Sequence, residues 1–334
     1  METNALGAKK RNAFNFKKWS RSRNGQQTFI IIAFMIIPLL LLFVFTYLPF
    51  GEMVKFSFYD MKYVGRRTWV GLQNYKDVFQ RTDCFAALKL SLYYLLGGVL
   101  QIILALYLAT ILSFKVKLGN LFKGCMFFPF LINGIAVGFI FKFFFTRGYV
   151  FDTVLQWCGF SLQNLPYWLK DQSVNNFSLM GASIWRYFGQ NMVLFIGAIM
   201  SVDGSMYEAA ELDGANKFQQ FIYIILPNIK SVFVLNIMLS VSGSLSAFEP
   251  PYVITAGANG TATYFVVMDR IAHTSQKVGL ASAMAVVLLG IILILTLLQK
   301  LFFKYVFKNA EDDNPKKFKR EQRKLAAAKG GAAQ

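Results

Sequence analysis

The residues with the clearest chemical potential in this sequence are polar side chains embedded in an apolar stretch. Residues 177–200 form an apolar run that contains Arg186, Gln190 and Asn191. An arginine at the centre of a membrane-spanning helix costs about 2.5 to 3.5 kcal/mol on insertion scales, so its guanidinium should face a polar cavity. The chemistry indicated is binding of a polar solute between helices. The alternative is a structural role, in which Arg186 pairs with a carboxylate or with helix carbonyls.

A second unusual segment, EAAELDGANKFQQFIYIILP at 208–227, places three acids within six residues between two apolar runs. The residues from Glu208 to Asp213 favour a helix, and the acids are expected at its start, where the helix dipole favours negative charge. Gly214 then permits a backbone turn that is closed to other residues. This part of the segment predicts a short acidic helix followed by a sharp turn.

Beyond the turn, apolar side chains recur at i, i+3, i+4 and i+7. They are Phe218, Phe221, Ile222 and Ile225. This spacing predicts a second, amphipathic helix that lies against the membrane face and ends at Pro227. The helix pair is interpreted either as a docking site for another protein or as an interfacial anchor of the helix bundle.

The other reactive side chains point away from enzyme chemistry. Three cysteines (Cys84, Cys125 and Cys158) and one histidine (His273) make neither a disulfide framework nor a metal-ligand cluster. A single Cys84–Cys158 bridge is the minor alternative to isolated thiols. The sequence holds no G-x-x-x-x-G-K-[ST], so binding of ATP by a P-loop is not expected. Neither a catalytic residue nor a metal site is predicted.

The elements that position these residues are predicted to be membrane-spanning helices. The chain has 334 residues, of which 55% are hydrophobic and 16% charged, against roughly one-quarter charged in soluble domains. Six apolar runs are long enough, at about 18 residues or more, to cross a bilayer as helices. They cover residues 29–50, 90–114, 125–145, 177–200, 231–248 and 278–298. The predicted fold class is an all-α membrane protein with six transmembrane helices.

The distribution of Lys and Arg predicts the orientation. Six spans place both termini on one side of the membrane, where the tails and loops hold 22 Lys and Arg against 12 on the other side. The positive-inside rule then places both termini in the cytoplasm. The predicted organisation is a basic tail at 1–28, a six-span domain at 29–307 with a cytoplasmic loop at 203–230, and a basic tail at 308–334. The net charge of +18 fits contact with membrane lipid and not with nucleic acid.

The acidic segment resembles the EAA loop of ABC-importer permeases, which reads E-A-A-x-x-D-G-A with a proline further on. The matching residues are Glu208, Ala209, Ala210, Asp213, Gly214, Ala215 and Pro227. Three other stretches, GLQNYKDVF, FFPFLINGIAVGFIFKFFF and GLASAMAVVLL, resemble the carbohydrate-importing, MalF-like branch, and the resemblance covers residues 28 to 307. It implies a type I ABC-importer permease fold with a cytoplasmic coupling helix. The stretch FEPPYVITAGANGTAT departs from the F-D-x-x-Y-x-L-T-x-G-G-P of that branch, which leaves the particular sugar open.

The resemblance also implies function and partners. The chain would be the permease subunit of an ATP-driven, binding-protein-dependent importer for a sugar, with an oligosaccharide preferred over glycerol-linked phosphate. Two separate ABC ATPase subunits would bind ATP and Mg, and one of them would dock on residues 208–215, so that this chain binds no cofactor itself. A second, different permease chain and an extracellular or periplasmic solute-binding protein would complete the importer. The implied location is the bacterial inner (cell) membrane, as a multi-pass protein.

Residue positions carried over from that branch imply a substrate site between the fourth and fifth spans. Its residues are Arg186, Tyr187, Gln190, Ser240, Gly243, Ser244 and Ala247, with Asn133 on the third span as a weaker candidate. Neighbours three and four residues apart share a helix face. Arg, Gln, Ser and Tyr supply the hydrogen bonds and aromatic contacts that a sugar needs, and Arg would also match a carboxylate on a charged sugar.

Two other classes of membrane protein are considered. A secondary transporter of a small polar solute, driven by an ion gradient, needs acids inside its spans. The six predicted spans contain no Asp or Glu, since Glu249 falls just past the fifth. A membrane enzyme needs clustered His, Asp or Cys within the spans, and the sequence shows none.

Overall fold

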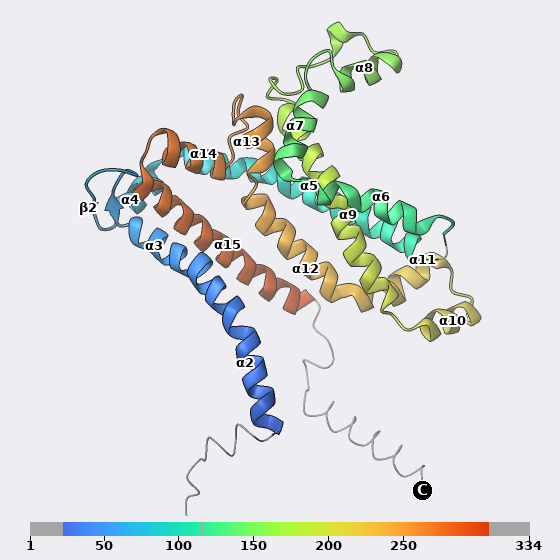
Figure 1. The fold of residues 1–334 in the computed structure, drawn as a ribbon. Coiled ribbons are helices and arrows are strands. Elements are labelled where there is room, and N and C mark those ends of the chain that lie inside the picture. Colours follow the sequence, from blue (N-terminus) through green and yellow to red (C-terminus); the bar gives the residue numbers. More distant parts are fainter. Residues whose placement is uncertain (1–22, 115, 307–334) are drawn as a thin grey trace, which may run out of the picture.

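The computed structural model describes residues 23–114 and 116–306, so the predicted tail at 308–334 and most of the tail at 1–28 lie outside the described residues. Helices dominate the fold (Figure 1). The elements before the first sharp bend are α2 (Arg23–Leu42), η1 (Phe43–Tyr47), α3 (Leu48–Phe56), β1 (Tyr59–Asp60), β2 (Thr68–Trp69), α4 (Gln73–Gln80), α5 (Thr82–Ser113) and α6 (Gly119–Leu131). Those after it are α7 (Gly134–Phe144), α8 (Val150–Trp157), η2 (Leu162–Asn164), α9 (Asn175–Met200), α10 (Gly204–Leu212), α11 (Lys217–Gln220), η3 (Phe221–Ile225), α12 (Leu226–Leu245), α13 (Glu249–Thr255), α14 (Tyr264–Asp269), η4 (Arg270–Thr274) and α15 (Val278–Val306). The two short strands pair antiparallel, with Tyr59 opposite Trp69.

Four helices in the described part of the chain are long and apolar enough to cross a membrane, and two bent helix pairs raise the number to six. The four are Ile30–Phe56, Thr82–Ser113, Lys217–Thr255 and Val278–Val306. The bent pairs are α6 with α7 and α9 with α10. The all-α fold with six candidate spans is confirmed.

The prediction of one straight span over 125–145 is wrong. Helix α6 ends at Leu131 and α7 begins at Gly134, and the two helices meet at an angle of 97°. Between them Ile132 is extended, and the side chain of Asn133 accepts a hydrogen bond from the Ile135 amide at 2.9 Å. A side chain that satisfies one of the first free amides of a helix starts a new helix there. The chain therefore turns at Asn133 instead of passing straight on.

The prediction that the acids of the segment 208–227 lie at the start of their helix is wrong. Helix α10 begins at Gly204, where the side chain of Asp203 accepts the Ser205 amide at 3.0 Å. This hydrogen bond lowers the pKa of Asp203. Glu208 and Glu211 therefore lie in the middle and last turn of α10, and Asp213 follows its end.

The prediction that the second, amphipathic helix ends at Pro227 is also wrong. Helix α11, the wider turn η3 and helix α12 run on from one to the next through Pro227. In η3 the Leu226 amide bonds to the Phe221 carbonyl, five residues back, and the Asn228 side chain donates to the Ile224 carbonyl at 2.7 Å. These bonds accommodate a proline that has no amide hydrogen to give. The predicted amphipathic helix is thus the beginning of the fifth span, and Ile225 is fully buried in the core.

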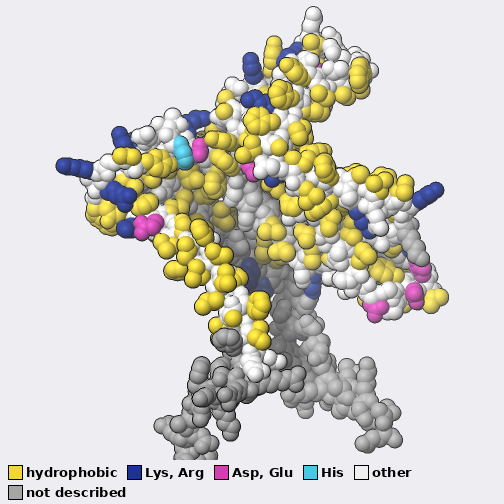
Figure 2. Space-filling model, in the orientation of Figure 1, with side chains coloured by type: hydrophobic (Ala, Val, Ile, Leu, Met, Phe, Trp, Pro, Cys, Tyr) yellow, Lys and Arg dark blue, Asp and Glu magenta, His cyan; other side chains and the backbone are white. Residues whose placement is uncertain are grey.

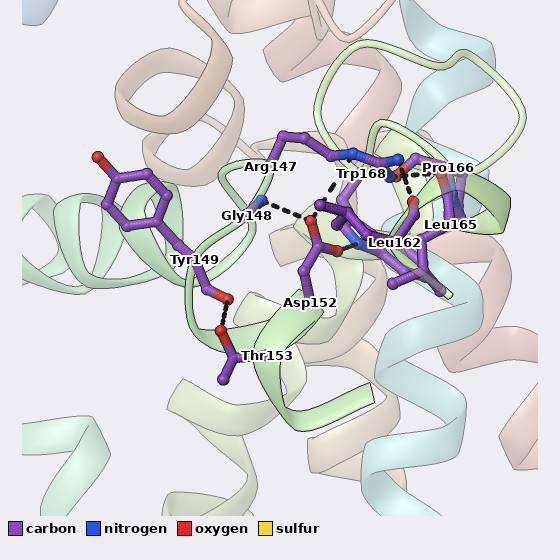
Figure 3. A network of polar contacts seen from close by, with 9 residues as sticks. All are labelled: Arg147, Gly148, Tyr149, Asp152, Thr153, Leu162, Leu165, Pro166 and Trp168. Carbon is purple, nitrogen blue, oxygen red and sulfur yellow. Dashed lines mark hydrogen bonds and ion pairs between the residues drawn. The ribbon is translucent and has the colours of Figure 1, made fainter. Parts of the chain in front are cut away.

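The segment after α7, which is expected to be an outer loop, folds into a small knob of residues 146–174 that carries α8. The buried carboxylate of Asp152 accepts hydrogen bonds from the Gly148 amide at 2.6 Å and from the Trp168 indole at 2.7 Å (Figure 3). Arg147 donates to backbone carbonyls within 162–166, and its Nε lies 3.9 Å from Asp152 Oδ2. Because the buried charge is both paired and hydrogen-bonded, this polar centre can hold the knob together without a large apolar core.

Helix α9 packs closely against both α5 and α6. Helices α5 and α9 run along each other, and a side chain added at Gly97 would collide with Met180. A side chain at Gly189 would collide with the backbone around Met126, so glycine is what allows α6 to approach α9. The candidate span Ile30–Phe56 differs from the rest, since its most apolar stretch is not buried at all within the described structure.

The surface of the bundle is apolar along its sides and charged toward its ends. Figure 2 shows hydrophobic side chains over most of the visible helix faces, with acidic side chains gathered at the end formed by α10. Figure 1 places α10 at the same end of the bundle as the start of α2 and the end of α15. The knob, α13 and α14 lie at the other end.

Candidate functional site

A cavity of about 550 Å³ opens between α5, α9 and α12. Helices α5 and α12 approach closely at its wall, where a side chain at Gly98 would collide with that of Ser240. The lining residues come from these three helices, from the short segment that joins α12 to α13 and from the start of α13. They are Tyr94, Gly97, Gly98, Gln101, Ser183, Tyr187, Gln190, Asn191, Asn236, Leu239, Ser240, Gly243, Ser244, Ser246, Ala247, Phe248, Glu249 and Pro250.

One wall of the cavity is a break in the fifth span. Helix α12 ends at Leu245 and α13 starts at Glu249, followed at once by Pro250 and Pro251. Prolines have no amide to continue a helix, but they fit its first turn, so the helix stops and restarts here. The carbonyl of Ala247, left free by the break, accepts a hydrogen bond from Thr263 Oγ1 at 2.6 Å. Irregular backbone of this kind is tolerated at membrane depth where it lines a cavity.

Six of the eight residues predicted for the substrate site line this cavity. They are Tyr187, Gln190, Ser240, Gly243, Ser244 and Ala247. The structure thus brings together the two helix faces that the spacing of three and four residues predicts. Their part in binding a substrate stays a prediction.

The other two predicted residues, Arg186 and Asn133, are not among the lining residues. Asn133 is occupied in capping α7. The guanidinium of Arg186 forms an ion pair with the carboxylate of Glu249 and lies 5.0 Å from the centre of the Tyr187 ring. Arg186 therefore fits the structural role, in which it pairs with a carboxylate, better than direct contact with a solute.

The Arg186–Glu249 pair sits where both helix breaks meet. Arg186 is roughly 16 Å along α9 from Asn175, at 1.5 Å per residue. Gly134, the first residue of α7, lies so close that a side chain there would overlap both charged groups. Glu249, placed outside the spans by the sequence, therefore reaches deep into the bundle and lines the cavity itself.

Sequence reasoning missed the whole contribution of α5. Gly97 and Gly98 lack any hydropathy signal, and only Gln101, which interrupts the apolar run, marked that helix as facing something polar. Two buried atoms on the cavity wall, Tyr94 Oη and Asn236 Oδ1, have no hydrogen-bond partner within the described residues. Buried polar groups are normally paired, so these two atoms hold hydrogen-bonding capacity that the described residues do not use.

The turn after α10 is built around Gly214. This residue has a φ of 77°, which confirms the predicted turn, and its amide donates to the Glu211 carbonyl at 3.1 Å. The Ala215 amide donates to the Ala210 carbonyl at 2.9 Å. This pair of bonds, with glycine in the left-handed region, is the Schellman ending of a helix.

Helix α10 is held at two points and is otherwise exposed. The Tyr207 ring packs edge-on against Phe114 at the end of α5, with ring centres 6.1 Å apart. Lys217 Nζ donates to Glu211 Oε1 at 2.6 Å, which lowers the pKa of Glu211 through the hydrogen bond and the positive charge. Leu212 is 90% exposed. An exposed, firmly oriented helix with a free apolar side chain can dock on another protein.

The remaining reactive groups do not form a second site. The three cysteines are free thiols, of which Cys84 is buried. Over residues 23–114 and 116–306, no group of three or more His, Cys, Asp or Glu is placed to hold a metal ion. The arrangement as a whole can bind a polar solute in the cavity and can contact a partner through α10.

Several known proteins resemble this chain in sequence or in fold. A family described as "Binding-protein-dependent transport system inner membrane component" matches residues 101–308. The chain is 32% identical to the probable ABC transporter permease protein YurN of Bacillus subtilis, over 83% of this chain and 97% of that protein. It is 32% identical to the arabinooligosaccharides transport system permease protein AraP of the same organism, over 70% of this chain and 76% of that one. A chain from the crystal structure of a bacterial alginate ABC transporter in complex with an alginate pentasaccharide-bound periplasmic protein superposes with a TM-score of 0.73. The superposition covers 87% of this chain and 99% of the transporter chain, and the two sequences are 18% identical. The likeness is therefore one of fold alone.

Proposed function

Because the chain belongs to the family of binding-protein-dependent transport system inner membrane components, we propose that the solute which it carries across the membrane is an oligosaccharide. The chain is a transport subunit and not an enzyme. The observation that carries the proposal is the cavity of about 550 Å³, in which Tyr187, Gln190 and Ser240 face small residues. A mostly apolar cleft of 300 to 1,000 Å³ with a few convergent polar groups is typical of a small-molecule site. The similarity to a permease named for arabinooligosaccharides supports a saccharide.

The proposed importer contains further subunits. The exposed helix α10 is suited to dock on an ABC ATPase, which would bind ATP and Mg, while a second permease chain would pack beside this one. Closure of an ATPase pair would then move α10 and, through η3 and α12, tilt the fifth span as a rigid body. A solute-binding protein would deliver the solute at the other end of the bundle, where the knob exposes Trp157 and Phe160.

The experiment that tests this function is reconstitution. The chain would be produced together with the permease, ATPase and binding protein encoded beside it, and the complex placed in liposomes. We expect ATP-dependent accumulation of at least one of radiolabelled arabinotriose, maltotriose and chitobiose when the binding protein is present. Accumulation that follows a proton or sodium gradient and ignores ATP would instead identify a secondary transporter.

The proposed orientation places both termini and α10 in the cytoplasm, at a bacterial cell membrane. It rests on the excess of Lys and Arg on that side, and the arrangement of α2, α10 and α15 in Figure 1 is consistent with it.

Cysteine labelling checks this orientation. In a background where Cys84, Cys125 and Cys158 are replaced by alanine, Arg66→Cys should react with a membrane-impermeant maleimide in intact cells. Ser205→Cys, at the start of α10, should react only after the membrane is opened. The reverse pattern would invert the topology.

A further inference from the structure

The cavity carries a single formal charge. Among its lining residues Glu249 is the one acidic side chain, and every other polar group there is an amide, a hydroxyl or a phenol. None of the lining side chains is a Lys, Arg or His. A solute inside the cavity therefore meets one carboxylate and no cation on the wall.

The position of Arg186 decides which side of the ion pair faces the solute. The side chain of Arg186 is 15% exposed, whereas that of Glu249 is 40% exposed. Arg186 lies behind the wall, covered by the Tyr187 ring, while Glu249 lies on it. The pair is thus polarised, with its negative end toward the cavity and its positive end in the protein.

This arrangement suits the hydroxyl groups of a neutral sugar. A carboxylate held in place accepts hydrogen bonds from hydroxyl groups about twice as strongly as a neutral oxygen does. The lining amides of Gln190 and Asn191 and the hydroxyl of Ser240 can add donors and acceptors. An anionic sugar would instead place a second negative charge beside Glu249, and the two like charges would repel each other.

We propose that Glu249, fixed from behind by Arg186, is the specificity-determining residue of this cavity and selects uncharged over anionic oligosaccharides. The inference rests on the proposed function and names the substrate class of the same site. It also corrects the expectation that Arg186 would favour a carboxylate-bearing sugar, because that arginine is already paired with Glu249. A likeness of fold to an alginate transporter leaves the charge of the solute open.

The test measures binding to the permease itself, so that the selectivity of the binding protein does not enter. The assembled permease–ATPase complex, in detergent and without binding protein, would be equilibrated with tritiated maltotriose, arabinotriose or trigalacturonate. Wild type should bind the better neutral trisaccharide at least tenfold more tightly than trigalacturonate. Glu249→Gln keeps the volume and removes the charge, and it should reduce that preference about tenfold or more, since a hydrogen bond to a charged group is the stronger kind. Glu249→Asp keeps the charge and should retain most of the preference.

A second variant covers the possibility that Glu249→Gln fails to assemble because it leaves Arg186 unpaired. The double variant Arg186→Gln/Glu249→Gln removes both charges, and copurification with the ATPase shows whether it is assembled. If wild type binds a neutral trisaccharide and the assembled variants keep its full preference over trigalacturonate, the inference is overturned while the proposed function stands. If wild type binds no trisaccharide of the three, both are overturned.

Discussion

Replacing Ala247 by tryptophan should abolish uptake while the protein still inserts and assembles. Ala247 lies in the break between α12 and α13, and its side chain lines the cavity. An indole there would occupy the space proposed for the solute and would narrow the passage between α9 and α12. Overpacking a fitted site costs typically about 1 to 3 kcal/mol or more, which corresponds to a loss of roughly fivefold to more than a hundredfold. Because the hydrogen bond from Thr263 reaches the backbone carbonyl of Ala247, the break itself should survive the substitution.

The measurement is ATP-dependent uptake into proteoliposomes, together with copurification of the ATPase. Leu235→Trp is the matched control, since Leu235 is on the same helix α12, is 50% exposed and does not line the cavity. The control should transport normally. Undiminished uptake by the assembled Ala247→Trp protein would place the path of the solute elsewhere.

Gly214→Val is expected to separate ATP hydrolysis from transport or to release the ATPase. A left-handed conformation costs an ordinary residue about 1 to 2 kcal/mol, and a β-branched side chain is a genuine outlier there. Because the φ of Gly214 is 77°, valine would open the turn that sets the angle between α10 and α11. The contact surface of α10 would then point away from its proposed partner.

Gly204→Val is the control for this effect. An added Cβ meets nothing within 4 Å at either glycine, but only Gly214 has a positive φ. The two variants therefore differ in backbone strain and not in crowding. ATPase activity, solute uptake and copurification should all change in Gly214→Val and stay near wild type in Gly204→Val. Normal uptake by Gly214→Val would remove α10 from the coupling mechanism.

The spans could be predicted from the sequence because a membrane helix is recorded in the length of an apolar run. The turns inside a span could not, since hydropathy averages over the residues that cause them. Residues 125–145 are apolar except for Asn133 and Lys142, and the 97° bend falls where the Asn133 side chain accepts a hydrogen bond from the Ile135 amide. Pro227 shows the opposite case, because a proline that usually ends a helix is accommodated here by a wider turn and by the side chain of Asn228.

The cavity could be predicted only on the helices that carry polar residues. Arg186 and Gln190 marked α9, whereas Gly97 and Gly98 on α5 contribute open space, which a sequence does not display. Glu249 was placed outside the membrane because it follows the fifth apolar run. Its position depends on where α13 packs against α7 and α9, which is a tertiary property.

The close approach at Gly134 sets an order on how this protein can change during evolution. A Cβ at position 134 would overlap the terminal atoms of Arg186 and Glu249, so a larger residue there requires these two flexible side chains to move and disturbs their ion pair. Loss of Arg186 alone would leave a carboxylate without its partner, and loss of Glu249 alone would leave a buried cation. A lineage that acquires a different solute is therefore expected to replace both charges in close succession, and to vary more readily at position 134 once the pair is gone.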